Sequence, residues 1–188
     1  MNSYCPTNKE DWRNWLKENH LIKDSIWIIF YKTSSPNLNL TWSEAVDEAL
    51  CFGWIDSTKK AIDSEKYIQY FCKRKPKSNW SKVNKDKVKA LIEQELMEEA
   101  GHKSIEIAKE NGSWNILDEV EAVVVPEDLK GALANCKGAM EYFESLSKSA
   151  KKILLYWVVS AKRAETRQKR ILEIAENASE NLKPKQFR

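Results

Sequence analysis

The residues best suited to chemistry lie in a basic, aromatic segment, FCKRKPKSNWSK, at residues 71–82. Its cations suit a phosphate or carboxylate, and its aromatic ring suits stacking on a base or a sugar. Short polar groups near its end can cap a following helix or hold an anion at the helix N-terminus. The alternative is a solvated loop before a helix, with the tryptophan packed into the core. The candidate ligand-binding residues of this segment are Arg74, Lys75, Lys77, Asn79, Trp80 and Lys82.

A second basic segment, AKRAETRQKR, occupies residues 161–170. If it is helical, Arg163, Arg167 and Arg170 fall on one stripe, which together with Lys162 forms a second set of candidate anion ligands. Three arginines in line are costly unless they meet carboxylates, phosphates or water. The alternative is a structural cluster, in which they pair with Glu165, with Asp56 or with the acidic middle of the chain.

Asp56 is a weak candidate for an acid or base; the alternatives are an arginine anchor or merely the entry to the hairpin. It follows Trp54 at i+2, so the two side chains face the same side of an extended strand. Both are included among the candidate ligand-binding residues. Cys51 beside Phe52 favours a buried small hydrophobe over a nucleophile, because no histidine lies near it in the sequence.

Several classes of site are excluded by what the 188 residues lack. With five glycines there is neither a G-x-G-x-x-G nor a G-x-x-x-x-G-K-[ST] loop, and G-x-S-x-G and H-E-x-x-H are missing as well. The four cysteines are widely spaced and the two histidines lie far apart, so we expect free thiols in a reducing compartment, no metal and no cofactor.

Charge is distributed unevenly along the chain, although the net charge is only +3. Thr58–Lys89 and Ser147–Arg170 are basic, and Ala90–Leu146 is acidic. This pattern favours a cationic and an anionic side, or blocks that neutralise each other. A specific nucleic-acid partner is not expected, because the acidic block repels a long polyanion. Charged content of 31% without a long apolar run predicts no membrane insertion, and the N-terminus shows no export signal.

The first half predicts a small sheet with helices. A capping box at Thr7–Glu10 opens a helix to about His20, and Ser25–Thr33 is predicted to be a strand buried on both faces. A second capping box, Thr41–Glu44, opens a helix that ends by Gly53. Strands at 54–59 and 66–72 form a hairpin with one buried face.

The second half predicts only helices. Their expected ranges are 82–94, 97–111, 127–135, 139–146 and 147–178, the last with a break near 160–163. The fold class is therefore α+β: a mostly antiparallel sheet of about three strands packed with helices, followed by an all-helical C-terminal half. We expect a single domain over 1–188, with an α/β part at 1–84 and a helical part at 85–188.

Three segments resemble one known family. ALCFGWIDS at 49–57, KRKPKSNWSKVN at 73–84 and SAKRAETRQKRI at 160–171 are similar to the bacterial bacteriocin-protection, YdeI/OmpD-associated family. The resemblance runs in order over nearly the whole chain. It implies a bacterial, cytoplasmic protein but no reaction, because the family is named from phenotype and association.

From these observations we expect a small phosphate- or carboxylate-bearing ligand to bind between the 73–82 segment and the arginines at 163–170. An alternative is an enzyme that uses Asp56, with the cations stabilising an oxyanion or a phosphate. A third is a stress-related scaffold whose acidic and basic faces bind protein partners.

Overall fold

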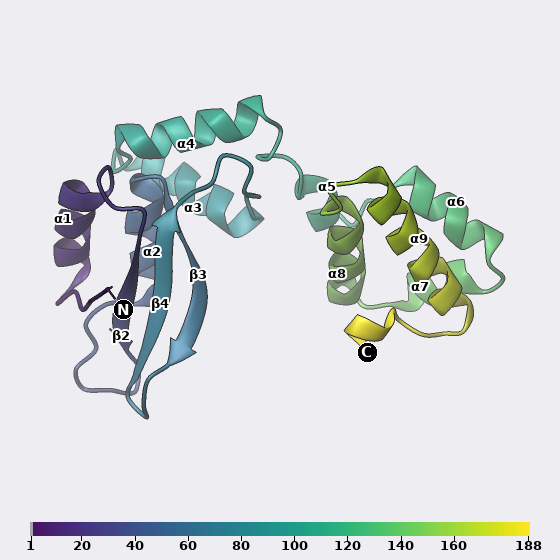
Figure 1. Ribbon diagram of the computed structural model, residues 1–188, viewed down its shortest axis with the longest axis horizontal. Coiled ribbons are helices and arrows are strands. Elements are labelled where there is room, and N and C mark those ends of the chain that lie inside the picture. The colour runs from purple at the N-terminus through teal and green to yellow at the C-terminus, as the bar shows by residue number, and fades with distance from the viewer. Residues whose placement is uncertain (1) are drawn as a thin grey trace. The chain divides into compact units, whose positions relative to one another are not determined.

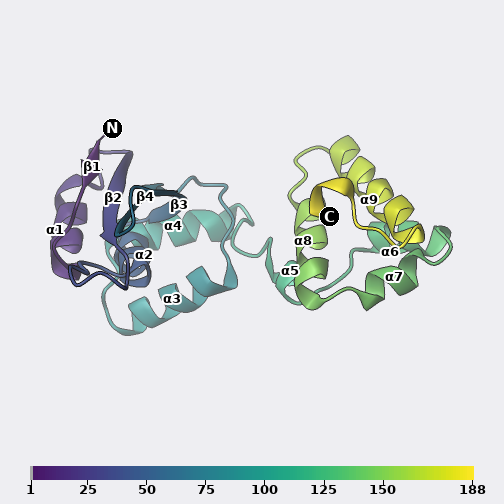
Figure 2. The ribbon, with the colours of Figure 1, turned by 90° about the horizontal axis from the view of Figure 1, so that it is seen from below.

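The computed structural model describes residues 2–188 and confirms the α+β class with a helical C-terminal half. It divides into two compact units, Met1–Trp114 and Asn115–Arg188, here called unit 1 and unit 2. The division falls later in the chain than the expected boundary at residue 84, because two helices, α3 (Lys82–Glu93) and α4 (Glu99–Glu110), belong with the sheet. Figures 1 and 2 show the elements of each unit.

The sheet of unit 1 has four strands in the order β1-β2-β4-β3. The long strands β2 (Ser25–Tyr31), β4 (Lys66–Lys73) and β3 (Trp54–Ala61) pair antiparallel, as the sequence predicts. The short β1 (Ser3–Tyr4) adds a parallel edge strand that was not predicted, because two residues carry no periodicity.

Only one face of the sheet is fully buried. In β2 the residues Ile26, Ile28 and Phe30 are buried, and the residues between them are half-buried. The prediction of a strand buried on both faces is therefore wrong, because α2 (Trp42–Cys51) lies against one face of the sheet (Figures 1 and 2). The hairpin has one buried face, as predicted, but that face carries Gln69 and Phe71 of β4. Ile68, Tyr70 and Cys72, whose apolar alternation suggested the buried face, are only half-buried.

Helix caps decide where the first two helices begin. Helix α1 (Lys9–Asn19) is capped by Asn8, whose side chain accepts from the Asp11 amide at 2.9 Å, so the predicted capping box at Thr7 is wrong. Thr7 instead donates its amide and hydroxyl to the Asp11 carboxylate. The capping box of α2 at Thr41 is confirmed in both directions.

Unit 2 contains α5 (Asp118–Glu121), α6 (Glu127–Asn135), α7 (Ala139–Ser145), α8 (Lys148–Val159), α9 (Ala164–Ser179) and the 3₁₀ turn η1 (Lys185–Phe187). The expected break near 160–163 is confirmed as the interval between α8 and α9, whereas α5 was not predicted. Helix α9 contributes Ile171, Ile174 and Ala175 to the core that it shares with α6, α7 and α8. In the described part of the chain, no helix has the length and apolarity needed to cross a membrane.

Candidate functional site

A cavity of about 220 Å³ in unit 1 lies where the end of α1, the turn between α2 and β3, the end of β4 and the start of α4 meet. It brings part of the basic segment together with residues that the sequence analysis did not single out. Its lining residues are His20, Leu21, Phe52, Gly53, Trp54, Lys73, Arg74, Lys75, Pro76, Ala100, Lys103, Ser104 and Ile107.

Two glycines allow the backbones around this cavity to approach each other. Gly53 has φ +71°, a left-handed conformation that favours glycine, and a Cβ there would lie 2.7 Å from the Ala100 carbonyl oxygen. A Cβ on Gly101 would collide with the Cys51 carbonyl at the end of α2. The Gly53 carbonyl also accepts from the Arg74 amide at 2.9 Å, which fixes the end of β4 beside the turn.

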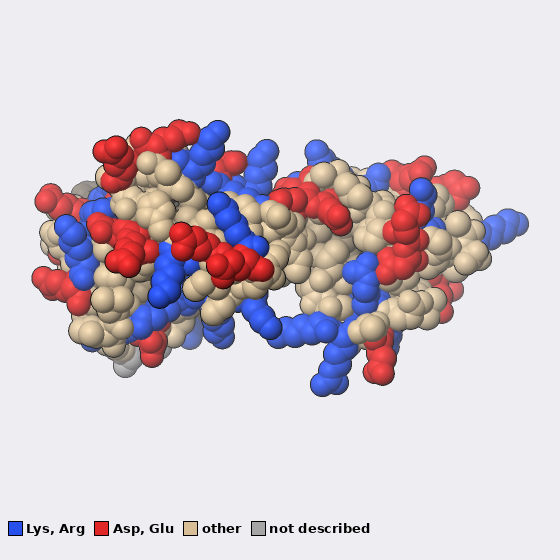
Figure 3. Space-filling view, turned by 90° about the horizontal axis from the view of Figure 1, so that it is seen from above, with Lys and Arg blue, Asp and Glu red and all other residues tan. Residues whose placement is uncertain are grey.

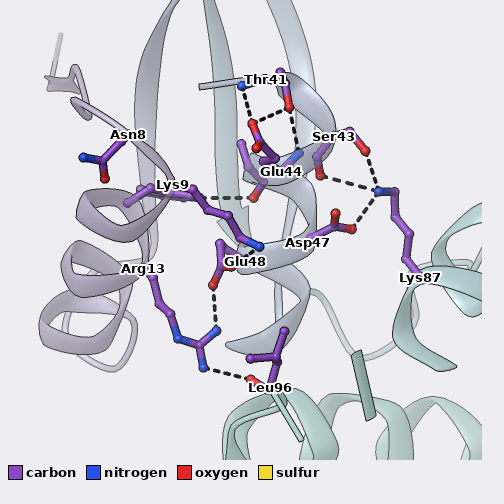
Figure 4. Close-up of polar contacts among 12 residues, drawn as sticks. Asn8, Lys9, Arg13, Thr41, Ser43, Glu44, Asp47, Glu48, Lys87 and Leu96 are labelled. Atoms are coloured by element: carbon purple, nitrogen blue, oxygen red, sulfur yellow. Dashed lines mark hydrogen bonds and ion pairs between the residues drawn. The ribbon is translucent and has the colours of Figure 1, made fainter. Parts of the chain in front are cut away.

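Figure 4 shows the ion pair between Arg13 of α1 and Glu48 of α2. Glu48 on α2 is only 2% exposed, and its carboxylate accepts from Arg13 Nη1 at 2.6 Å and lies 3.3 Å from Lys9 Nζ. Arg13 Nη2 also donates to the Leu96 carbonyl at 2.8 Å and pairs with Glu98 at 3.0 Å. Arg13 thereby joins α1, α2 and the segment leading into α4, whose ends line the cavity.

Arg74 is the most unusual group in this wall. Its guanidinium carbon lies 3.6 Å from the centroid of the Trp80 ring, and its Nη2 donates to the Asn79 carbonyl at 2.6 Å. Its Nε and Nη1 are buried and have no hydrogen-bond partner among residues 2–188. Burial lowers the pKa of Arg74 to about 10, and the charge of Asp56 opposes this shift only in part. The site therefore holds a desolvated cation that lacks a matching anion.

Three lysines add positive charge to the wall. Lys73 already has partners within the protein, since its Nζ donates to the Leu21 carbonyl at 2.9 Å and forms an ion pair with Asp24 at 3.1 Å. Lys75 and Lys103 are exposed and form no ion pair within the described residues. Lys75 was predicted as a ligand-binding residue, whereas Lys103 on α4 was not, because it lies in the acidic part of the sequence.

Both candidate tryptophans of unit 1 belong to the core. Trp54 is fully buried, and its indole nitrogen donates to the His20 carbonyl at 3.4 Å. Trp80 is 1% exposed and packs against Trp114 with ring centroids 4.9 Å apart. Trp80 therefore follows the alternative in which the tryptophan packs into the core. The Arg74 guanidinium lies over its ring, so the ring offers no free face for stacking a ligand.

Asp56 does not line the cavity. Its Oδ2 accepts from Trp42 Nε1 and from Gln69 Nε2, both at 2.8 Å. Asp56 belongs to β3, which is an edge strand of the sheet, and its partner Trp42 remains 45% exposed. This arrangement holds the carboxylate in a fixed position, and a catalytic role for Asp56 stays a prediction.

The remaining candidates of the basic segment lie outside the cavity lining. Lys77 and Lys82 are exposed, and Asn79 contributes its backbone carbonyl to Arg74. Ser81 caps α3, with its hydroxyl oxygen accepting from the Asn84 amide at 3.2 Å. The capping role foreseen for the short polar residues thus falls to Ser81.

The arginines at 163–170 lie in unit 2 and serve that unit. Arg163 precedes α9 in an extended conformation, with φ −118°, so together with Lys162 it lies outside the helix and the predicted three-arginine stripe is wrong. Arg167 forms a paired contact with Asp128 at 2.7 and 2.9 Å, which lowers the pKa of that carboxyl. Arg170 donates to the Trp157 carbonyl at 2.6 Å. Pairing of Arg167 with the acidic middle of the chain is the structural alternative raised from the sequence. A ligand site formed by both basic segments stays a prediction.

The described residues include no group of three or more His, Cys, Asp or Glu side chains placed to hold a metal ion.

On the face shown in Figure 3, acidic and basic side chains are interspersed over each unit. Burial raises the pKa of the Cys51 thiol to about 11, which suits a core residue rather than a nucleophile.

Comparison with known families assigns each unit separately. Residues 4–104 match the family model described as a domain of unknown function (DUF8412), and residues 122–181 match the model described as bacteriocin-protection, YdeI or OmpD-associated. The second match confirms the resemblance seen in the sequence, although it is partial and includes only the motif at 160–171. The motifs at 49–57 and 73–84 fall within the first match. No curated protein and no solved structure matches the chain.

Proposed function

The chain belongs to the DUF8412 family and matches the bacteriocin-protection, YdeI or OmpD-associated model in its second unit; since neither description names an activity, we propose from the cavity that unit 1 binds a small anionic ligand. The observation that carries this proposal is Arg74, a half-buried residue whose Nε and Nη1 atoms are buried and have no hydrogen-bond partner among the described residues. We further propose that the protein acts in the bacterial cytoplasm, as the sequence resemblance implies.

An anion is the ligand that best offsets the cost of this arrangement. A buried charge is unfavourable unless it is paired and hydrogen-bonded, and a guanidinium suits the flat oxygen pairs of carboxylates and phosphates. Lys75 and Lys103 on the same wall add two further cations. A carboxylate or phosphate beside Arg74 gains their attraction while it neutralises the desolvated charge.

The size and walls of the cavity limit the rest of the ligand. Its volume of about 220 Å³ is below the ~300–1,000 Å³ of pockets for drug-sized molecules. Leu21, Phe52 and Ile107 supply apolar walls beside the cations. We therefore infer a metabolite-sized anion with a compact apolar part.

Duplex DNA fits these features poorly. A sequence-independent nucleic-acid binder presents a continuous basic surface, whereas the face in Figure 3 intersperses acidic and basic side chains. We expect any duplex binding to fade by physiological salt. Submicromolar affinity for a labelled duplex that persists at that salt would contradict the small-anion proposal.

The proposal is tested by isothermal titration calorimetry with inorganic phosphate, sulfate and a series of short carboxylates. Arg74→Met should weaken binding about ten- to a hundredfold, since hydrogen bonds to a charged group contribute about 1.5–3 kcal/mol. Lys103→Gln should weaken binding less, because Lys103 is exposed. Lys77→Gln is the matched control: it removes a charge from the same segment but outside the cavity lining. Equal affinity in the wild-type protein and Arg74→Met contradicts the proposal.

A further inference from the structure

His20 lines the cavity, and one hydrogen bond of its ring selects which tautomer the neutral imidazole adopts. Its Nδ1 lies 2.9 Å from the Leu16 carbonyl oxygen. A carbonyl oxygen can only accept, so Nδ1 carries the hydrogen and donates it. In the neutral imidazole the other nitrogen, Nε2, is then an acceptor. No other described residue is hydrogen-bonded to Nε2.

The ring is held firmly in this orientation. It packs against Phe52 with centroids 5.1 Å apart, and the His20 amide donates to the Leu16 carbonyl at 2.8 Å. The His20 carbonyl accepts from Trp54 Nε1. A fixed acceptor of this kind discriminates between ligands, since it costs little further ordering when a donor binds.

The polar side chains around His20 differ between its two sides. On the cavity wall they are the cations Lys73, Arg74, Lys75 and Lys103, together with Ser104, whose hydroxyl donates to the Gly101 carbonyl at 2.8 Å. A neighbouring cavity of about 460 Å³ shares His20, Leu21, Ala100 and Lys103 and is also lined by Glu98 and Glu99. His20 thus lies between a cation-rich wall and a wall that carries carboxylates.

We infer that the ligand of this site is a small anion that also carries a hydrogen-bond donor, a hydroxyl or an ammonium group, which His20 Nε2 accepts. The inference rests on the proposed function, because Arg74 fixes the anionic end. The donor end then lies toward His20, and the compact carbon skeleton contacts Leu21 and Phe52. An ammonium group gains in addition from the carboxylate of Glu99 in the neighbouring cavity, since Glu98 is paired with Arg13, whereas a hydroxyl depends on His20 alone.

Three ligands with one carbon skeleton test this inference by calorimetry: 4-methylpentanoate, 2-hydroxy-4-methylpentanoate and leucine. At least one of the two donor-bearing molecules should bind the wild-type protein about three- to tenfold more tightly than 4-methylpentanoate, the usual gain from one hydrogen bond. Which one binds more tightly distinguishes the hydroxyl from the ammonium group.

Two substitutions at His20 separate its acceptor from its structural role. His20→Asn keeps an amide donor in place of Nδ1 for the Leu16 carbonyl but has no group at the Nε2 position. The preference for the donor-bearing ligands over 4-methylpentanoate should therefore disappear. His20→Gln places an amide near the Nε2 position and should restore part of it. Lys103→Gln should weaken all three ligands alike and keep their ratio.

The outcomes are distinguishable. If all three ligands bind the wild-type protein equally and Arg74→Met abolishes binding, the inference fails and the proposed function stands. A donor preference that persists in His20→Asn also overturns the inference. If none of the three ligands binds, and phosphate and sulfate do not bind either, both the inference and the proposed function fail.

Discussion

Arg74→Met is the substitution in which a binding role and a structural role for the guanidinium predict different stabilities. Burial lowers the pKa of Arg74 to about 10, which means that the folded protein disfavours the charged form by roughly 3 kcal/mol. Against this penalty stand one hydrogen bond to the Asn79 carbonyl, contributing about 1.5–3 kcal/mol, and the contact with the Trp80 ring, contributing about 0.5–2 kcal/mol. Methionine keeps apolar cover over Trp80 and removes the penalty. The free energy of unfolding should therefore change by no more than about 2 kcal/mol.

The assay is urea denaturation of the wild-type protein and of Arg74→Met, each with and without inorganic phosphate. Phosphate that binds the folded state raises its stability by RT ln(1 + [L]/Kd), and this gain should be larger in the wild-type protein. General salt effects are common to both proteins and cancel in the comparison. Breaking a structural buried ion pair costs about 3–5 kcal/mol, so a loss of that size, with equal phosphate effects, would refute the reasoning.

Three further substitutions test other parts of the structure by chemical denaturation. Trp80→Ala should destabilise the protein by about 3–5 kcal/mol, because the ring is 1% exposed; a loss below about 1 kcal/mol would contradict its place in the core. Gly101→Ala should cost about 1–3 kcal/mol and weaken anion binding, because its Cβ meets a backbone carbonyl of α2. Its control, Gly131→Ala on α6, has open space and should stabilise by up to about 1 kcal/mol, and similar effects at both positions would be inconsistent with this packing. Arg167→Gln should cost about 0.2–1 kcal/mol at neutral pH. Pairing with Arg167 lowers the pKa of Asp128, so the stability that the pair contributes is present above the ordinary carboxyl pKa and is lost as the pH falls through the lowered pKa. If Arg167→Gln destabilises the protein as much in acid as at neutral pH, the ion pair is not the cause.

Local features of the fold could be predicted because short segments encode them. The Thr41 capping box needs only a hydroxyl and a carboxylate three residues apart, and both contacts form. The hairpin follows from alternation along β4, and the interval between α8 and α9 was placed correctly at 160–163. At the first helix the same local reasoning predicts Thr7 as the cap, and this is wrong. The Thr7 hydroxyl donates to the Asp11 carboxylate, and Asn8 caps the helix instead.

The candidate site was only half visible in the sequence. Arg74 and Lys75 were recognised from their cationic, aromatic context, and both line the cavity. His20 and Lys103 were not, since they are far away along the chain and belong to no motif. The turn at Gly53 was predicted as the end of the second helix, but what this turn packs against depends on α4.

What the sequence by itself determined was the type and order of the elements, because caps, alternation and turn residues act over a few neighbouring positions. The partners of the charged and aromatic side chains were decided by tertiary packing. Arg74 carries a charge in any conformation, yet only its burial against Trp80 leaves that charge without a matching anion. Arg167 carries the same group, and it meets Asp128 because α9 packs on α6. Burial and long-range proximity set the energy of a charge, and neither is a property of the local sequence.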